Sequence, residues 1–156
     1  LLIKHSKAFF IQKRVGKNQK LFTLIKFRSM SPKAANLPTH EISVDLITKT
    51  GKFIRATKLD ELPQLWNVLK GEMSLVGPRP CLPTQEELIS ERALRGVFSL
   101  RPGITGPAQV QNIDMSTPRK LAEEDSQMVN NLKIDDYFKY VLMTISGSGR
   151  GDKVRG

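Results

Sequence analysis

The stretch KLDELPQLWNVLKGEMSLVGPRP, residues 58–80, contains the clearest structural pattern in this chain of 156 residues. Its apolar residues follow the spacing i, i+3, i+4, i+7, which predicts one apolar face of a helix: they are Leu62, Leu65, Trp66 and Leu69. Pro63 has to lie near the first turn, because an interior proline breaks the hydrogen-bond ladder. The helix is therefore predicted to begin close to Asp60 and to end at Gly71. We expect Trp66 to pack in the core with the three leucines.

Upstream of this stretch, the chain contains two apolar-rich runs, Phe9–Val15 and Leu21–Phe27. The polar sequence Gly16-Lys17-Asn18-Gln19 separates them, which is typical of two strands joined by a hairpin turn. Residues 31–50 contain two prolines and show no clear periodicity. We interpret them as a long loop that covers a site.

Downstream, start and stop signals predict three further helices: from Thr84, in a capping box with Glu87, to before Gly96; from Thr117, with Pro118 in the first position; and from about Asp136 to Ile145. The predicted fold class is α+β, with a small sheet or hairpin and several amphipathic helices. One domain would span residues 1–146, followed by a flexible basic tail at 147–156.

The charge of the chain limits its partners. The sequence has 25 Lys+Arg against 15 Asp+Glu, a net charge of +10. Such an excess favours nucleic acid, an acidic membrane surface or phosphorylated substrates, and it does not choose among them. The single cysteine, Cys81, excludes an internal disulfide and a multi-thiolate metal site, and we expect it to be a packing residue. No apolar run has the roughly 18 residues of a membrane span.

Two adjacent carboxylates, Asp60 and Glu61, lie at the predicted helix start. The helix dipole favours the ionised form of both there. One ionised carboxylate can be a nucleophile, and a second can hold a hard cation such as magnesium. The alternative is that both residues only complement the dipole, which is the commoner use of acidic residues in a first turn.

Several arginines lie in constrained settings. Arg79 stands between Pro78 and Pro80, so its guanidinium loses little entropy when it binds a phosphate in a bidentate fork. Further candidates are Arg55, five residues before Asp60; Arg28, at the end of the second strand; and Arg101, which opens the turn-rich segment RPGITGP. Each could instead be a solvated surface charge, and the segment could be a simple turn.

Three segments in this order resemble the bacterial polyprenyl-phosphate phosphoglycosyltransferases, a monotopic sugar-transferase family: KFRSM at 26–30, the block at 58–80, and RPGITGPAQV at 101–110. The resemblance extends from about Phe9 to about Ile145. It implies a membrane-associated catalytic domain on the cytoplasmic face of a bacterial inner membrane, resting partly on an anionic lipid surface. Members carry an apolar membrane segment before the matched region, so we expect that segment to be missing or truncated here, with Leu1-Leu2-Ile3 as its remnant.

The resemblance also implies a reaction. Asp60 would attack the β-phosphate of a UDP-sugar and release UMP, and undecaprenyl (polyprenyl) phosphate would then take up the phosphosugar. Glu61 would help to hold Mg²⁺, and Arg55 with Pro78, Arg79 and Pro80 would bind substrate. This would be the first membrane step in the assembly of an O-antigen, capsule, exopolysaccharide or glycoconjugate.

Two departures and two alternatives accompany this interpretation. Lys58 stands where many members have a small hydroxyl residue, and Gln111-Asn112-Ile113-Asp114 replaces a segment that often contains an arginine. The chain could be a non-catalytic membrane-surface scaffold of the same family, or a basic nucleic-acid-binding module. From the resemblance we expect no nucleic acid partner. The sugar stays open among galactose, glucose, an N-acetylated amino sugar and a deoxyamino sugar.

Overall fold

An antiparallel hairpin forms the first part of the described chain. The computed structural model describes residues 8–30, 49–131 and 133–146. Strand β1 (Phe9–Val15) pairs with β2 (Leu21–Phe27) in a register that places Phe9 opposite Phe27. The turn between them contains a short 3-10 helix, η2 (Lys17–Gln19), and the N–H of Gly16 donates to the carbonyl of Lys20 at 2.9 Å. Both strands and the turn are confirmed as predicted.

A second, parallel pair of strands was not predicted. Strand β3 (Ser74–Val76) pairs with β4 (Gly103–Thr105), which lies within the turn-rich segment. A Cβ atom at Gly103 would lie 2.1 Å from the backbone nitrogen of Gly77, so only glycine permits this close approach. The two strands come from sequence segments about 30 residues apart, and neither segment is long enough to show a strand period.

The structure contains helices close to the four predicted positions and two, α1 and α4, that were not predicted. The bounds are α1 (Lys49–Ala56), α2 (Gln64–Leu69), α3 (Glu86–Leu94), α4 (Pro107–Val110), α5 (Pro118–Asn131) and α6 (Ile134–Ile145), with 3-10 turns η6 (Leu59–Glu61) and η7 (Val97–Ser99). Helix α5 begins with Pro118 as predicted. Of the predicted loop at 31–50, residues 49 and 50 belong to α1, and residues 31–48 lie outside the described part, as do Leu1–Ile3 and the predicted tail at 147–156.

Two predicted helix starts were wrong by two residues. The N-cap of α3 is Gln85 and makes no side-chain capping bond, so the capping box at Thr84 does not form. Helix α6 begins at Ile134 because the carboxylate of Asp136 accepts a hydrogen bond from the Lys133 N–H at 3.4 Å. The α+β class with small sheets is confirmed.

Helix α2 has the opposite orientation to the prediction. Leu65, Trp66 and Leu69 are exposed, with 58% of the Trp66 surface accessible, so the prediction of a core tryptophan is wrong. The fully buried residues of α2 are polar, Gln64 and Asn67, and the partly buried Val68 packs beside them against the cluster under the hairpin. The predicted start near Asp60 is also wrong, because η6 precedes the helix and Pro63 is its N-cap.

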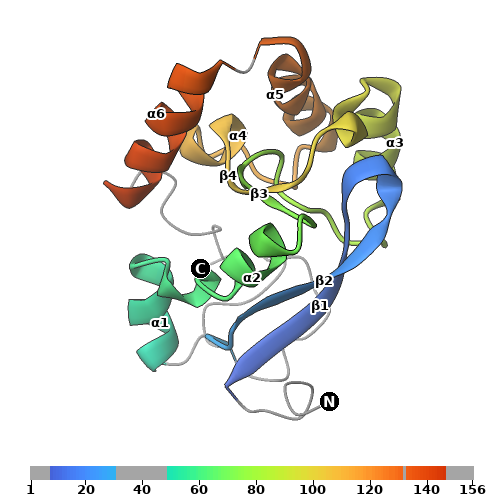
Figure 1. Ribbon diagram of the computed structural model, residues 1–156. Helices are drawn as coiled ribbons and strands as arrows, with labels where there is room; N and C mark the ends of the chain where they lie inside the picture. Colours follow the sequence, from blue (N-terminus) through green and yellow to red (C-terminus); the bar gives the residue numbers. More distant parts are fainter. Residues whose placement is uncertain (1–7, 31–48, 132, 147–156) are drawn as a thin grey trace.

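The side chain of Asn67 explains this orientation. It is fully buried, and its amide donates to the carbonyl of Thr23 at 2.8 Å and to the Glu72 carboxylate at 2.7 Å. Its oxygen accepts from the N–H of Ile25 at 3.3 Å. These bonds fasten the polar face of α2 to strand β2, and Figure 1 shows α2 lying beside the hairpin. Burial without them would be costly, so the apolar face points outward.

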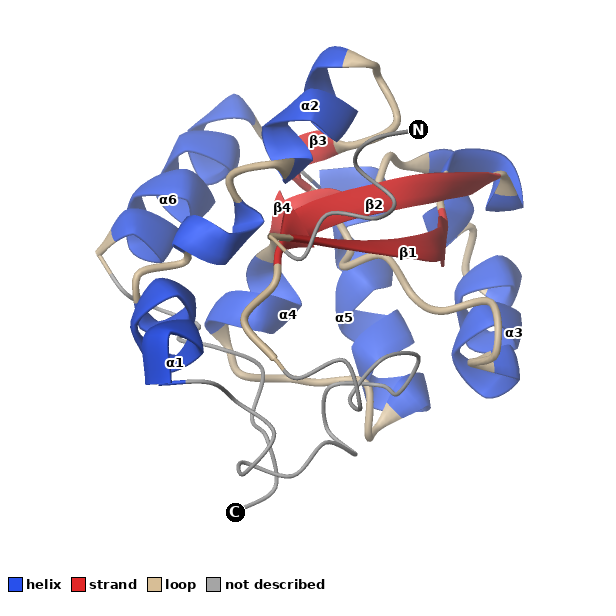
Figure 2. Cartoon of the chain, turned by 90° about the horizontal axis from the view of Figure 1, so that it is seen from below, coloured by secondary structure: helices blue, strands red, loops and turns tan. Residues whose placement is uncertain are grey.

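The apolar core consists of two clusters. One combines β1 with the helical part: Val15, Cys81, Leu88, Ala108, Leu121 and Ala122. The other lies under the hairpin and contains Phe22, Leu24 and Met73. Cys81 is buried, as predicted, and Met128 on α5 is buried as well. Figure 2 shows the hairpin from below among the surrounding helices. Within the part of the chain that the structure describes, no helix is long and apolar enough to cross a membrane.

We predict that Asn67→Ala destabilises the protein by about 3 kcal/mol, because it leaves buried backbone groups of β2 without partners. Chemical denaturation monitored by circular dichroism measures this loss. Asn131→Ala, at an exposed position in α5, is the matched control and should have little effect. Equal stabilities of the two variants would contradict the role of Asn67 in fixing α2.

Candidate active site

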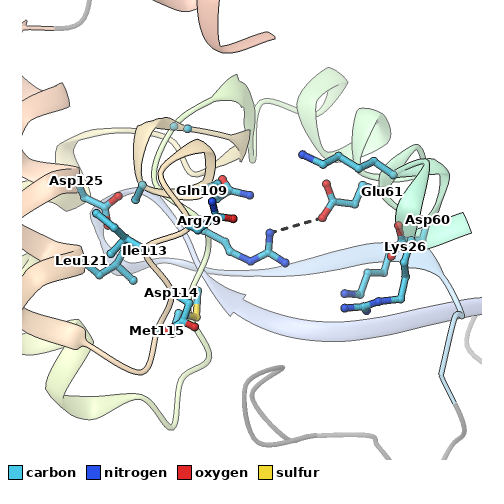
Figure 3. A pocket seen from close by; sticks show the side chains of 16 residues that line it. Lys26, Asp60, Glu61, Arg79, Gln109, Ile113, Asp114, Met115, Leu121 and Asp125 are labelled. Carbon is cyan, nitrogen blue, oxygen red and sulfur yellow. Dashed lines mark ion pairs between the residues drawn. The ribbon is translucent and has the colours of Figure 1, made fainter. Parts of the chain in front are cut away.

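A pocket opens where the end of β2, the η6 turn, the loop after β3 and helices α4 and α5 meet (Figure 3). Its charged lining on one side comprises Lys26, Arg55, Lys58, Asp60, Glu61 and Arg79. Its remaining lining includes Gln109, Asn112, Ile113, Asp114, Leu121 and Asp125. In Figure 3, Arg79 lies between the Asp60 end and the end formed by Ile113 and Leu121.

Asp60 is a buried wall residue of this pocket, with 5% of its surface accessible. Burial raises the pKa of its carboxyl group above the usual value, and the positive charges of Lys26, Arg55 and Arg79 act in the opposite direction. The net shift of this pKa is therefore opposite to the one expected from a helix dipole alone. The residue lies in a three-residue 3-10 turn and is deeply desolvated, and desolvation is the larger effect.

Glu61 forms an ion pair with Arg79, a cation that also acts on Asp60. A carboxylate oxygen of Glu61 lies 3.6 Å from a guanidinium nitrogen of Arg79, and Figure 3 draws this contact as a dashed line. Both side chains are largely buried, with 15% and 22% of their surface accessible. Arg79 therefore pairs directly with Glu61 and also acts on Asp60, so one guanidinium links the two carboxylates of the dyad.

The backbone around Lys58 directs the dyad into the pocket. Lys58 adopts the left-handed conformation with φ of 56°, between the end of α1 and η6. The N–H of Lys58 donates to the backbone carbonyl of Arg55 at 3.1 Å, and the N–H of Glu61 donates to the backbone carbonyl of Lys58 at 3.1 Å. This tight turn brings Arg55, five positions before Asp60, to the same pocket as the dyad.

The structure brings four of the predicted site residues together and places the others elsewhere. Asp60, Glu61, Arg55 and Arg79 line the pocket. Pro78 and Pro80 are buried and line a smaller hollow on the other side of their turn.

Arg28 and Arg101 are not among the described residues that line the main pocket. The Arg28 guanidinium donates to the carbonyl of Phe9 at 3.0 Å. Arg101 is exposed, and its guanidinium lies near Gly71. Neither arginine lines the pocket that contains the dyad, and a substrate-binding role for either of them stays a prediction.

Several lining residues were not predicted from the sequence. Lys26 belongs to the KFRSM segment, and its position one residue before the end of β2 was the available signal. Gln109 lies in α4, and its side-chain oxygen is buried with no hydrogen-bond partner within the described ranges 8–30, 49–131 and 133–146. Asp125 forms a buried ion pair with Arg92 at 2.6 Å. Its position in a predicted helix gave no sign of this pairing.

Comparison with known proteins places this geometry in context. The model of a family described as bacterial sugar transferase matches residues 1–150. An uncharacterized sugar transferase, EpsL of Bacillus subtilis (strain 168), is 41% identical over 143 residues, which cover 90% of this chain and 69% of that protein. The galactosyl transferase CpsE of Streptococcus agalactiae serotype III (strain NEM316) is 40% identical, covering 88% of this chain and 34% of CpsE.

A third relative carries a more detailed name. The UDP-glucose:undecaprenyl-phosphate glucose-1-phosphate transferase of Caulobacter vibrioides is 38% identical over 147 residues. The match covers 88% of this chain and 55% of that protein. The chain thus spans about a third to two thirds of the length of these relatives.

We predict that Asp60→Asn stabilises the protein at neutral pH. Well below the ordinary Asp pKa of 3.8 the carboxyl is protonated in both the folded and unfolded states, so burial costs little. As the pH rises through the raised pKa of the folded state, the buried group must ionise and stability is lost. Asparagine does not ionise, so thermal unfolding of the variant should occur at a higher Tm than wild type at pH 7, and the difference should shrink towards pH 4.

Asp135→Asn, at an exposed position in the first turn of α6, is the control and should give no such gain. A gain for Asp60→Asn that is the same at every pH would show that ionisation of the carboxyl is not its cause.

Proposed function

Because the chain belongs to the bacterial sugar transferase family, we propose that it transfers a sugar phosphate from a UDP-sugar to undecaprenyl phosphate, with Asp60 as the nucleophile. Two further relatives, from Aeromonas hydrophila and Klebsiella pneumoniae, carry names of undecaprenyl-phosphate transferases for N-acetylgalactosamine phosphate and glucose-1-phosphate. We propose for this chain the reaction that these names have in common, without specifying the sugar.

The convergence of cations on Asp60 is the observation that carries this proposal. Lys26, Arg55 and Arg79 come from three separate segments, and all three lower the pKa of the same buried carboxyl. An anionic diphosphate can approach a carboxylate only where positive charge offsets the repulsion. A nucleic-acid-binding module would instead use its basic residues along an open surface, so the arrangement favours the enzyme.

In the first proposed step, a carboxylate oxygen of Asp60 attacks the β-phosphorus of the UDP-sugar. The bond from this phosphorus to the bridging oxygen breaks, and UMP leaves with the electron pair. The phosphosugar is then bound to Asp60 as an acyl phosphate. Arg79 and Arg55 are placed to stabilise charge on the phosphoryl oxygens during the transfer.

In the second step, a phosphate oxygen of undecaprenyl phosphate attacks the same phosphorus. The bond to Asp60 breaks, the carboxylate is regenerated, and the product is a lipid-linked diphosphate sugar. The single pocket would serve the soluble donor and the lipid acceptor in turn, as covalent catalysis allows. The raised pKa of Asp60 suits this role, since a desolvated carboxylate lacks the water shell that would have to be removed before attack.

Magnesium is part of the proposal, and the donor set fits it. No group of three His, Cys, Asp or Glu side chains forms a metal cage in residues 8–30, 49–131 and 133–146. Magnesium usually binds through one or two carboxylates together with substrate phosphates, and Glu61 and Asp60 offer hard oxygen ligands at the pocket. The ion would neutralise phosphate charge, and Glu61 is the proposed protein ligand.

The exposed apolar helix faces support an anionic membrane surface as the setting. Leu62 just before α2 and Leu65, Trp66 and Leu69 on it are exposed, and Ile134, Phe138 and Leu142 are exposed at every fourth position of α6. A protein in water rarely exposes so many large apolar side chains without a partner surface. The net charge of +10 complements an anionic leaflet, such as the proposed cytoplasmic face of a bacterial inner membrane.

We predict that Asp60→Asn abolishes UMP release from UDP-sugars and that no covalent adduct forms. The neutral amide is a poor nucleophile, so a loss of at least about 10³-fold is expected. The assay combines UMP detection, over a panel of UDP-sugars in lipid, with mass spectrometry of trapped protein. Asp135→Asn is the matched control and should retain full activity.

Undiminished UMP release by Asp60→Asn would remove the nucleophile assignment. Vesicle binding without any UMP release from the unaltered protein would instead favour the non-catalytic scaffold.

We predict that Trp66→Gln combined with Leu69→Gln weakens binding to vesicles of phosphatidylcholine and phosphatidylglycerol by roughly tenfold, because less apolar surface can enter the lipid. Vesicle co-sedimentation measures the partition coefficient. Leu94→Gln, on helix α3 with 78% exposure, is the control and should bind as wild type does. Equal losses for the α2 and α3 variants would count against a specific membrane face.

A further inference from the structure

The backbone segment from Pro78 to Cys81 is held by four donors from different places in the fold. The N–H of Gly103 donates to the Pro78 carbonyl at 2.9 Å, and the N–H of Val15 donates to the Cys81 carbonyl at 3.0 Å. The two carbonyls between them, of Arg79 and Pro80, accept hydrogen bonds from arginine side chains. All four successive carbonyls of this turn are therefore paired.

From this arrangement we propose that Arg92 and Arg14 are positioning residues, which hold the Arg79 guanidinium at the reactive pocket. This inference rests on the proposed function, in which Arg79 binds the diphosphate of the donor. Neither arginine lines the main pocket among the residues described there, so both act through the backbone of the turn.

The geometry of Arg92 suits this purpose. It lies on α3 with 2% exposure, and its guanidinium uses three donors. Two of them bind one carboxylate oxygen of Asp125, at 2.9 and 2.6 Å, and the third donates to the Arg79 carbonyl at 2.8 Å. Asp125 is 1% exposed and lies on α5. The planar guanidinium thus locks the turn to α3 and α5 at once, which a lysine cannot do.

Arg14 holds the next carbonyl from the hairpin. It lies on β1 with 9% exposure and donates to the Pro80 carbonyl at 3.0 Å. Its other terminal nitrogen donates to the Gln12 side chain at 2.7 Å. The turn is therefore fixed from the hairpin on one side and from the helices on the other.

The two prolines explain why side chains are needed. Pro78 and Pro80 have no N–H, so this segment cannot be held by a regular ladder of backbone bonds. Buried carbonyls without partners would be costly, and rotation of a peptide plane would turn the Arg79 side chain away from Glu61, 3.6 Å distant. A buried ion pair is often no more stabilising than an apolar pair of similar size. The Arg92–Asp125 pair is therefore better explained by its effect on the position of the Arg79 turn than by stability alone.

A double-mutant cycle distinguishes positioning from simple stabilisation. In the full chain, Arg92→Lys should lower kcat/KM for UMP release by about tenfold, the effect of losing one charged hydrogen bond. In an Arg79→Ala background the same substitution should lower it by less than about twofold, because the side chain to be positioned is absent. A purely structural Arg92 would cause the same loss in both backgrounds, and this result would overturn the proposal.

Three further variants complete the design. Arg14→Lys should show the same dependence on Arg79 as Arg92→Lys. Arg95→Lys, at the C-cap of the same helix and paired with Glu91 and Glu123, is the matched control and should retain wild-type kinetics. Should Arg92→Lys fail to fold, Arg92→Leu combined with Asp125→Leu removes the pair without leaving a buried charge, and it should show the same coupling.

Calorimetric binding of UDP provides a readout that needs no turnover. Arg92→Lys should weaken UDP binding by about tenfold, again only when Arg79 is present. The unaltered protein could release UMP normally while the losses from Arg92→Lys and Arg79→Ala simply add. That result would exclude the positioning role and leave the proposed function intact. Absence of both UMP release and UDP binding in the unaltered protein would remove both.

Discussion

The burial of a carboxylate among cations is the constraint on which the rest of this structure depends. Asp60 is almost inaccessible to water, which disfavours its charge, yet Lys26, Arg55 and Arg79 surround it. Desolvation is the larger of the two effects, so the group is poised with a raised pKa and little hydration. This balance requires that each cation be held in place, because a shift of one of them changes the charge that the carboxylate can bear.

The fold fixes these cations from separate elements. Lys26 extends from the end of β2, Arg55 from the last turn of α1, and Arg79 from the loop after β3. The Asn67 side chain ties α2, which follows the dyad, to β2, and buried arginines pair with the carbonyls of the Arg79 turn. Dipoles and charges that are already in place need no reorganisation when charge moves during a reaction.

The same short helix, α2, connects the site with the surface. Its polar face is bonded to the hairpin, and its apolar face is turned outward a few residues after Asp60. A lipid acceptor has an apolar chain and an anionic head, and such a molecule would meet apolar side chains and cations in close succession here. Membrane contact and chemistry would then depend on one set of hydrogen bonds.

Features that depend only on neighbouring residues along the chain could be predicted from the sequence alone. The hairpin, the start of α5 at Pro118 and the rigid setting of Arg79 were predicted because turn residues and prolines act on their immediate neighbours. Periodicity showed which residues of α2 share a face, but tertiary contacts of Asn67 decided that this face points outward. The parallel pairing of β3 with β4, the approach of Lys26 to Asp60 and the bond between Arg92 and Asp125 join residues 29 to 34 positions apart. Such contacts depend on the closure of long loops around a shared core, and no local pattern encodes which segments meet.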